Sequence, residues 1–146
     1  MYPRSHILFG AIFTLIIWYI SPEISPLYLA LIFLSSFLID FDHYLSSVIK
    51  TKEYSLKKSF IYHNKKLEEE KREIARGIRK KSDFHLFHTI EFHVLVGLLG
   101  LFWSGFFYIF IGMIFHSLLD VIGLLSRGAF HRREYFFFEW LGKNEK

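Results

Sequence analysis

The sequence predicts an all-α membrane protein: a single bundle of four transmembrane helices, arranged as two hairpins, with a charged cytoplasmic helical insertion between them. Three observations lead to this fold class. The 146 residues are 52% hydrophobic and 20% aromatic, which is too apolar for an ordinary soluble domain of this length. Apolar runs of nearly membrane-spanning length recur along the chain, and turn-forming residues separate them in pairs. All 18 Lys and Arg fall outside these runs, on one side of the resulting topology.

Each predicted element follows from hydropathy and from the turn residues. The first hairpin is expected to have spans at residues 5–20 and 27–45, with the turn-forming segment 21–26 between them. The second hairpin is expected to have spans at residues 84–103 and 106–125, separated by Ser104-Gly105. The run from Val94 to Phe115 also fits one span, which gives a three-span alternative that would place the charged and His-bearing ends on opposite sides. Residues 1–146 are therefore expected to form one membrane domain.

The basic residues set the expected orientation. Arg4 precedes the first span, twelve Lys and Arg lie in the insertion at residues 50–82, and five lie in the tail at residues 126–146. By the positive-inside rule, both termini and the insertion are cytoplasmic in a multi-pass protein of the cell (inner) membrane. The net charge of +4 is modest, and the basic residues flank apolar spans. Membrane lipids rather than nucleic acid are therefore the expected partners. The insertion is expected to contain a charged helix that forms a surface helix or a mobile arm.

Polar residues are concentrated near the cytoplasmic ends of the predicted spans. The chain has no Cys, so His and carboxylates are the available metal ligands. At about 1.5 Å per residue, one residue from each span falls about 20 to 23 Å from the outer end. These four residues are His6, Asp40, His88 and Asp120. Two more, Asp42 and His43, lie just beyond this layer, and two others, His93 and His116, lie about one turn deeper. Outside the spans, His63 and His131 are expected to be solvent-exposed.

Helical spacing groups some of these side chains on common faces. His116 and Asp120 are four residues apart, and Asp40 and His43 are three apart, so each pair is expected to project from one face. The same spacing relates His85, His88 and Glu91. In contrast, His93 lies about 140° around the helix from His88, so it is expected either to support a ligand without contacting the metal itself or to serve as an alternative ligand.

The grouping of acids and histidines predicts a metal site. An ionised Asp inside a bilayer is costly, and neighbouring Asp residues repel one another; a divalent cation offsets both effects. Mixed imidazole and carboxylate ligands suit Zn²⁺ best, with Mn²⁺ or Fe²⁺ as alternatives, and the number of candidates leaves room for two or more ions. The candidate ligands are His6, Asp40, Asp42, His43, His85, His88, His116 and Asp120.

Four segments of the chain resemble a known family. They are His6, Leu38-Ile39-Asp40-Phe41-Asp42-His43, His85-Leu86-Phe87-His88-Thr89, and His116-Ser117-Leu118-Leu119-Asp120. Together they resemble the YdjM-like family of membrane-bound metal-dependent hydrolases, and the HxxxD element is similar to one in zinc-dependent phospholipases C and related nucleases. The third segment lacks the Arg-Gly of the family's HRGxTHS-like stretch, so either His85 or His88 corresponds to the family's ligand.

The resemblance implies a metal-dependent hydrolase that cleaves a phosphoester, either lipid or small and nucleotide-like, at the cytoplasmic membrane face. Glu91 and Asp42 are the candidate catalytic groups, with Glu91 as general acid or base, and Arg127 is the candidate phosphate contact. Three other classes stay open. A metal transporter or sensor would use similar ligands, a haem carrier would pair His93 with His116, and a structural membrane protein would need no site at all.

Overall fold

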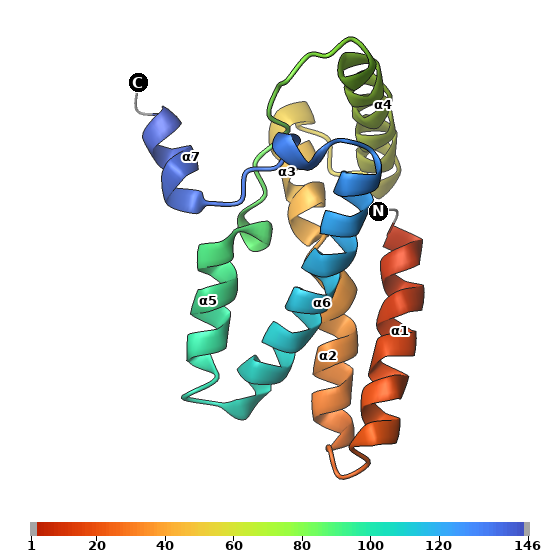
Figure 1. Ribbon diagram of the computed structural model, residues 1–146, viewed down its shortest axis with the longest axis vertical. Helices are drawn as coiled ribbons and strands as arrows, with labels where there is room; N and C mark the ends of the chain where they lie inside the picture. Colours follow the sequence, from red (N-terminus) through yellow and green to blue (C-terminus); the bar gives the residue numbers. More distant parts are fainter. Residues whose placement is uncertain (1–2, 145–146) are drawn as a thin grey trace.

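The computed structural model describes residues 3–144 and is helical, with no strand within that range. This confirms the predicted all-α class. Four helices form a bundle, namely α1 (Pro3–Ile20), α2 (Pro26–Leu38), α5 (Ile90–Leu99) and α6 (Ser104–Ser126). Helices α3 (Phe41–Thr51), α4 (Leu56–Ala75) and α7 (Phe137–Asn144) lie at one end of the bundle, the end where α1 begins and α6 finishes (Figure 1).

Two helical segments are long and apolar enough to cross a membrane. One is Pro26–Thr51, which contains α2 and α3, and the other is α6. The remaining bundle helices are apolar but shorter, and the ten residues of α5 extend only about 15 Å against a hydrocarbon thickness of about 30 Å. The prediction of four spans is thus supported for two helices and stays a prediction for the other two.

The third predicted span is a shorter helix than expected. The backbone is extended at His85, forms the 3₁₀ turn η1 (Leu86–His88), and becomes α-helical only at Ile90. Thr89 caps the new helix, because its side chain accepts a hydrogen bond from the Phe92 N–H at 3.4 Å. The expected common face of His85, His88 and Glu91 therefore does not exist, since only Glu91 belongs to α5.

The second predicted span is interrupted where the site begins. Between α2 and α3 the chain turns at Ile39 and Asp40, where the Asp40 N–H bonds to the Phe37 carbonyl at 3.2 Å and the His43 N–H to the Asp40 carbonyl at 3.0 Å. These tight turn bonds replace the regular helical pattern over one step. As a result, Asp40 and Asp42 approach the same histidine from different sides.

Burial in this bundle is inverted relative to a water-soluble protein. Within residues 3–144, five hydrophobic residues are buried, compared with thirteen polar or charged ones. Large apolar side chains of α1, α2, α5 and α6 are instead exposed around the outside of the bundle. A water-soluble protein of this size encloses mainly apolar residues. The outer surface of the bundle is therefore suited to an apolar surrounding, and its interior to polar side chains.

Small residues bring the helices close together. Gly112 of α6 lies against the Ile32 carbonyl and the Ser35 hydroxyl of α2, and Gly10 of α1 lies against the Ser36 hydroxyl. A Cβ at either glycine would overlap these atoms, so the close approach requires glycine. This packing sets the backbone of α2 directly beside the polar face of α6.

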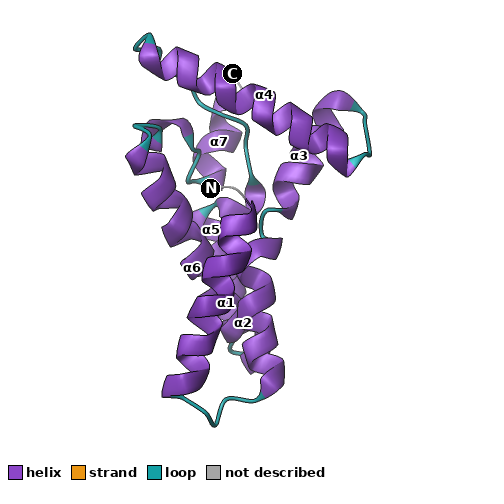
Figure 2. Ribbon diagram, turned by 90° about the vertical axis from the view of Figure 1, so that its right-hand side faces the viewer, coloured by secondary structure: helices purple, strands orange, loops and turns teal. Residues whose placement is uncertain are grey.

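Helix α4, in the charged insertion, packs across the end of the bundle (Figure 2). Its inner face is a polar stripe that recurs every three or four residues. The Ser59 hydroxyl bonds to that of Ser47 at 2.7 Å, His63 Nε2 lies 2.8 Å from the His43 carbonyl, and the Tyr62 hydroxyl donates to Asp83 at 3.0 Å. Farther along, Glu70 accepts from Ser82, and Glu73 pairs with Arg132. The helix thus contacts the rest of the chain along its length, as the surface-helix alternative expects.

Candidate metal centre

Four side chains from three chain segments place their ligand atoms together in the interior. They are Asp40 from the α2–α3 turn, His88 from η1, and His116 and Asp120 from α6, and their ligand atoms all lie within 4.8 Å of one another. His116 Nε2 lies 3.4 Å from both Asp40 Oδ1 and Asp120 Oδ2. His88 Nε2 lies 3.6 Å from Asp40 Oδ1 and 3.7 Å from Asp120 Oδ2, and the two Nε2 atoms are 3.1 Å apart. We call these four residues the metal cluster.

Hydrogen bonds outside the cluster orient both imidazoles. His116 Nδ1 lies 2.9 Å from the Ser36 carbonyl, and His88 Nδ1 lies 3.0 Å from Asp42 Oδ2. Both partners are acceptors, so each Nδ1 carries the proton and each Nε2 directs a lone pair into the cluster. Two lone-pair nitrogens and two carboxylate oxygens therefore converge on one point, an arrangement that favours a bound cation.

The distances fit a tetrahedral ion. Bonds of about 2.0 to 2.2 Å to nitrogen and carboxylate oxygen give tetrahedral ligand–ligand separations of about 3.3 to 3.6 Å. The His–His and His–carboxylate separations of 3.1 to 3.7 Å bracket this range. The buried His/Asp group can therefore hold a metal ion with little side-chain movement.

Asp120 also contacts residues outside the metal cluster. Its Oδ1 lies 3.1 Å from His6 Nε2, and the His6 ring stacks on His116 with a centroid separation of 4.0 Å. Its Oδ2 accepts a hydrogen bond from Arg133 Nη2 at 2.5 Å. His6 is fully buried and its Nδ1 makes no hydrogen bond within the described chain. His6 is thus placed to support Asp120 or to become a ligand itself.

A second group surrounds the other edge of His88. Asp42, His43 and His88 also have ligand atoms within 4.8 Å of one another. His85 lies beside them, with Nδ1 3.7 Å from Asp42 Oδ1 and its ring 3.8 Å from that of His43. Asp42 Oδ1 and His85 Nδ1 are buried without a hydrogen bond in the described chain. His43 Nε2 lies 3.4 Å from Asp40 Oδ1, on the same side as the cavity described below.

Two sequence candidates point elsewhere. The Glu91 carboxylate accepts hydrogen bonds from the Phe137 and Phe138 N–H groups at 2.9 and 3.4 Å, so it caps the start of α7. His93 places Nδ1 2.8 Å from the Thr89 carbonyl and Nε2 2.9 Å from the Ser117 hydroxyl. His93 is not paired with His116, as the haem alternative would require, because His116 faces the metal cluster.

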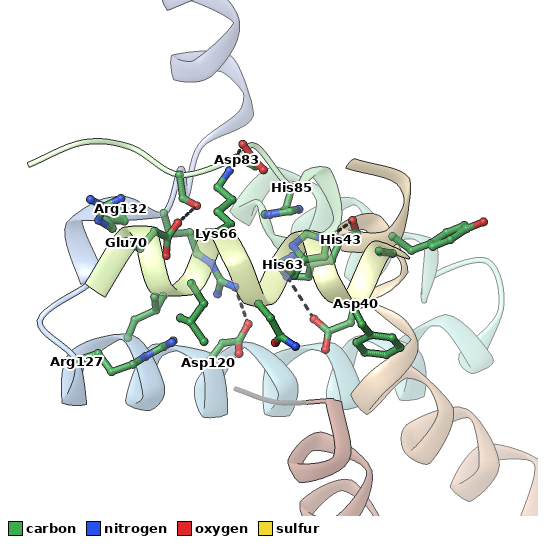
Figure 3. Close-up of a pocket in the computed structure, with 18 of the residues that line it drawn as sticks. Asp40, His43, His63, Lys66, Glu70, Asp83, His85, Asp120, Arg127 and Arg132 are labelled. Atoms are coloured by element: carbon green, nitrogen blue, oxygen red, sulfur yellow. Dashed lines mark hydrogen bonds and ion pairs between the residues drawn. The ribbon is translucent and has the colours of Figure 1, made fainter. Parts of the chain in front are cut away.

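A cavity of 280 Å³ separates the cluster from α4. Asp40, His43, His85 and Asp120 form its inner wall, and Tyr44, Leu56, Phe60, Leu67 and Leu124 add apolar surface. The side chains that surround it in Figure 3 come from opposite sides: His63, Lys66 and Glu70 from α4, and Asp40, Asp120 and Arg127 from the bundle. Arg132 and Arg133 complete the basic lining. His63, expected to be exposed, is half-buried here.

Asp83 forms ion pairs and a hydrogen bond at the outer rim of the cavity. Its carboxylate contacts Lys50 of α3 and Lys66 of α4, and accepts from Tyr62. Burial alone would raise the pKa of Asp83, but the two lysines lower it to about 2. Burial together with the Asp83 charge raises the pKa of Tyr62 to about 12. Asp83 thus stays ionised and joins three chain segments around the cavity.

Three features of the site were not predicted from the sequence. Arg133 was counted only as one of the tail's basic residues, although it contacts Asp120. The Ser36 carbonyl that orients His116 is backbone, so no residue type signals it. The polar stripe of α4 is visible in the sequence as polar residues recurring every three or four positions, but in so charged a segment this spacing does not separate an inner face from an outer one.

Comparison with known proteins adds no relative. No protein-family model, no curated protein and no solved structure matches this chain, so the site is defined by its own geometry.

Proposed function

We propose that this protein is a membrane-embedded, metal-dependent hydrolase that acts on a phosphoester at the cytoplasmic membrane face. One observation carries the proposal: two imidazole lone pairs and two carboxylates converge on one point that forms the wall of a cavity with basic residues. Convergent acceptors attract a cation, and the arginines of the cavity lining can contact an anion beside it. The resemblance to the YdjM-like family supports the same class.

The proposed membrane position follows from burial and charge together. We place α1, α2, α5 and α6 in the bilayer, because their outer surfaces are apolar and their buried residues are polar. The two turns at the far end of the bundle carry no Lys or Arg, whereas the 17 Lys and Arg within residues 3–144 lie toward the end with the metal cluster. The cluster would therefore face the cytoplasm.

A single ion in the metal cluster uses the hydrogen bonds already present. With Asp40, His88, His116 and Asp120 as ligands, Asp42 keeps its bond to His88 Nδ1 and orients that ring. A second ion at Asp42, His43 and His88 would require His88 to bind metal through both ring nitrogens. The ring would then have to lose its Nδ1 proton as well. We therefore propose one primary ion, with zinc best suited to this mixed tetrahedral set.

An ion held by Asp40, His88, His116 and Asp120 would supply Lewis acidity and lower the pKa of a water molecule bound to it. The protein's own residues supply orientation and proton transfer. His43 lines the cavity, lies 3.4 Å from Asp40 Oδ1 and is outside the four-ligand set, so it is the group placed to move a proton at the reacting centre. Arg127 lines the same cavity and can contact a phosphoryl oxygen. Glu91, bonded to α7, has a structural role in this scheme.

Metal analysis of the detergent-purified protein tests the proposal. Wild type is expected to bind about one equivalent of zinc, manganese or iron, and the double variant Asp40→Ala, Asp120→Ala to bind none. Glu23→Ala removes an exposed acid in the turn between α1 and α2 and is the matched control. Metal-loaded wild type should then hydrolyse members of a phosphoester and phospholipid panel. If wild type binds no metal after reconstitution with each ion, the proposal is wrong.

A further inference from the structure

Four acidic and four basic side chains line the cavity beneath α4, and one of its arginines, Arg133, contacts the metal cluster. We propose that this cavity binds a phosphoryl anion and that Arg133 is the residue that holds it, shifting from Asp120 to the anion when a metal ion occupies the cluster. This inference rests on the proposed function. It adds a substrate-binding residue and a coupling between metal and anion.

Arg133 is held in position by its main chain. The Arg132 carbonyl accepts from the Ser82 N–H at 2.7 Å, the Arg133 carbonyl accepts from Lys81 Nζ at 2.9 Å, and the Tyr135 carbonyl accepts from the Ile90 N–H at 2.9 Å. Three hydrogen bonds from residues 81–90 therefore fix the backbone around Arg133. A cation on a fixed backbone loses little freedom when it binds a ligand.

The Arg133 side chain contacts the oxygen that a metal would use. Its Nη2 lies 2.5 Å from Asp120 Oδ2, the same atom that faces His88 Nε2 and His116 Nε2. The guanidinium thus acts as a nearby positive charge for that carboxylate. A divalent ion in the cluster would take over this role, because two positive groups close to one oxygen repel each other. The fork of N–H donors on Arg133 would then be available to a phosphoryl group in the cavity.

The other basic side chains of the cavity have partners away from the metal cluster. Lys66 contacts Asp83, and Arg132 donates to Glu73 at 2.5 Å. Arg127 uses its Nε on the Gly123 carbonyl at 2.9 Å, and lies at the exposed end of α6. Arg133 is 12% exposed and is the basic residue in contact with the cluster. It is therefore the best placed to hold an anion against a metal-bound reaction centre.

The lining also indicates the size and character of the ligand. A cavity of 280 Å³ lies near the lower end of the range for small-molecule sites, which begins at about 300 Å³. It fits a phosphoryl group with a short substituent, and Phe60, Leu67 and Leu124 offer an apolar surface beside it. The phosphoryl group can belong to a lipid headgroup or to a soluble ester, and the experiment below separates the two.

Coupling between metal and anion gives a direct test. Mn²⁺-loaded and metal-free protein are placed in phosphatidylcholine nanodiscs, and inorganic phosphate binding is followed by ³¹P relaxation and by calorimetry. Phosphate is expected to bind more tightly to the Mn²⁺-loaded form, and to tighten Mn²⁺ binding by the same factor, because the two effects are linked. Equal phosphate affinity with and without Mn²⁺ would overturn the inference.

Variants identify the residue responsible. Arg133→Gln should weaken phosphate binding to the Mn²⁺-loaded protein by about 10- to 100-fold, the effect of losing a hydrogen-bonded charge, and should keep its Mn²⁺. Arg133→Lys should recover part of the loss. Arg79→Gln removes an exposed arginine in the loop after α4 and is the matched control. If Arg133→Gln and Arg79→Gln bind phosphate equally well in the Mn²⁺-loaded state, only this inference fails; if wild type takes up no metal, the proposed function fails with it.

Competition distinguishes the two sources of the phosphoryl group. Phosphatidic acid added to the nanodiscs should displace inorganic phosphate if the site takes a lipid headgroup. Glycerol phosphate in solution should displace it if the site takes a soluble ester. Displacement by either, lost in Arg133→Gln, supports the anion site, whereas displacement by neither would contradict it.

Discussion

Removing the Asp42 carboxylate tests how the metal cluster is organised. Asp42 Oδ2 accepts from His88 Nδ1 and from the Phe87 N–H, both at 3.0 Å, so it fixes the ring and its tautomer. In Asp42→Ala, His88 can rotate or protonate on Nε2. Loss of such a supporting contact weakens metal binding by about 10- to 100-fold, or about 1.4 to 2.7 kcal/mol. The expected zinc affinity of Asp42→Ala is lower by this factor, with full stoichiometry retained.

The isosteric variant Asp42→Asn separates charge from geometry. One oxygen of Asp42 accepts both hydrogen bonds, so an amide oxygen in its place can accept the same two. Only the carboxylate charge is lost, and the affinity should fall by less than about 10-fold, since a charge-assisted hydrogen bond is about twice as strong as a neutral one. The expected order of zinc affinity is therefore wild type, Asp42→Asn, Asp42→Ala and, weakest, Asp40→Ala, which removes a ligand.

The assay is a zinc competition titration against a chromophoric chelator, in detergent and at constant pH. Two results would refute the reasoning. Wild-type affinity in Asp42→Ala would mean that the His88 contact has no orienting role. A loss in Asp42→Ala as large as in Asp40→Ala would show that Asp42 is itself a ligand, and the arrangement with one ion would be wrong.

Three further predictions concern packing, pH and capping. Gly112→Ala should lower the free energy of unfolding by about 1 to 3 kcal/mol, because the alanine Cβ would overlap the Ile32 carbonyl. Gly142→Ala should leave it unchanged, because the space around position 142 is open. Thermal unfolding in detergent compares the two variants. Wild type should be more stable than Asp83→Asn above about pH 4, and this difference should disappear as the pH falls toward 2, because the pKa of Asp83 in the folded protein lies below its usual value of about 3.9. Unfolding followed by circular dichroism at each pH measures the difference in stability. A difference that stays constant with pH would contradict the prediction. Glu91→Gln should speed amide hydrogen exchange in α7 while zinc content stays at the wild-type level, and a loss of zinc would return Glu91 to the metal site.

Regular helix geometry accounts for the parts of the site that the sequence predicted. His116 and Asp120 are four residues apart within α6, and their ligand atoms are 3.4 Å apart. Counting depth along each span also grouped His6, Asp40, His88 and Asp120, and the structure brings these four residues together. Both arguments assume the rise and period of an α-helix. Helices α1 and α6 satisfy that assumption, whereas Asp40 lies in a turn and His88 in η1, so regular helix geometry does not explain the placement of these two residues.

The remaining parts depend on contacts between distant segments. Glu91 was expected at the site because the helix was predicted to begin at residue 84. The helix begins later, after its cap at Thr89, and the Glu91 carboxylate accepts a hydrogen bond from the Phe137 N–H, 46 residues away. Arg133 belongs to a tail whose basic residues the positive-inside rule already explains, so nothing in the local sequence separates it from its neighbours. Side chains whose role depends on a partner far along the chain are not predictable from spacing.

The short length of α5 has a consequence for where chemistry would take place. In the proposed orientation, a helix of about 15 Å crosses roughly one leaflet, and η1 and the extended segment before it continue toward the cytoplasm in its stead. Non-helical backbone at that depth needs protein or water around it, so the bilayer beside α5 would be thinned and hydrated. An ester near the glycerol level of a lipid could then meet water at the metal cluster without the lipid leaving its leaflet.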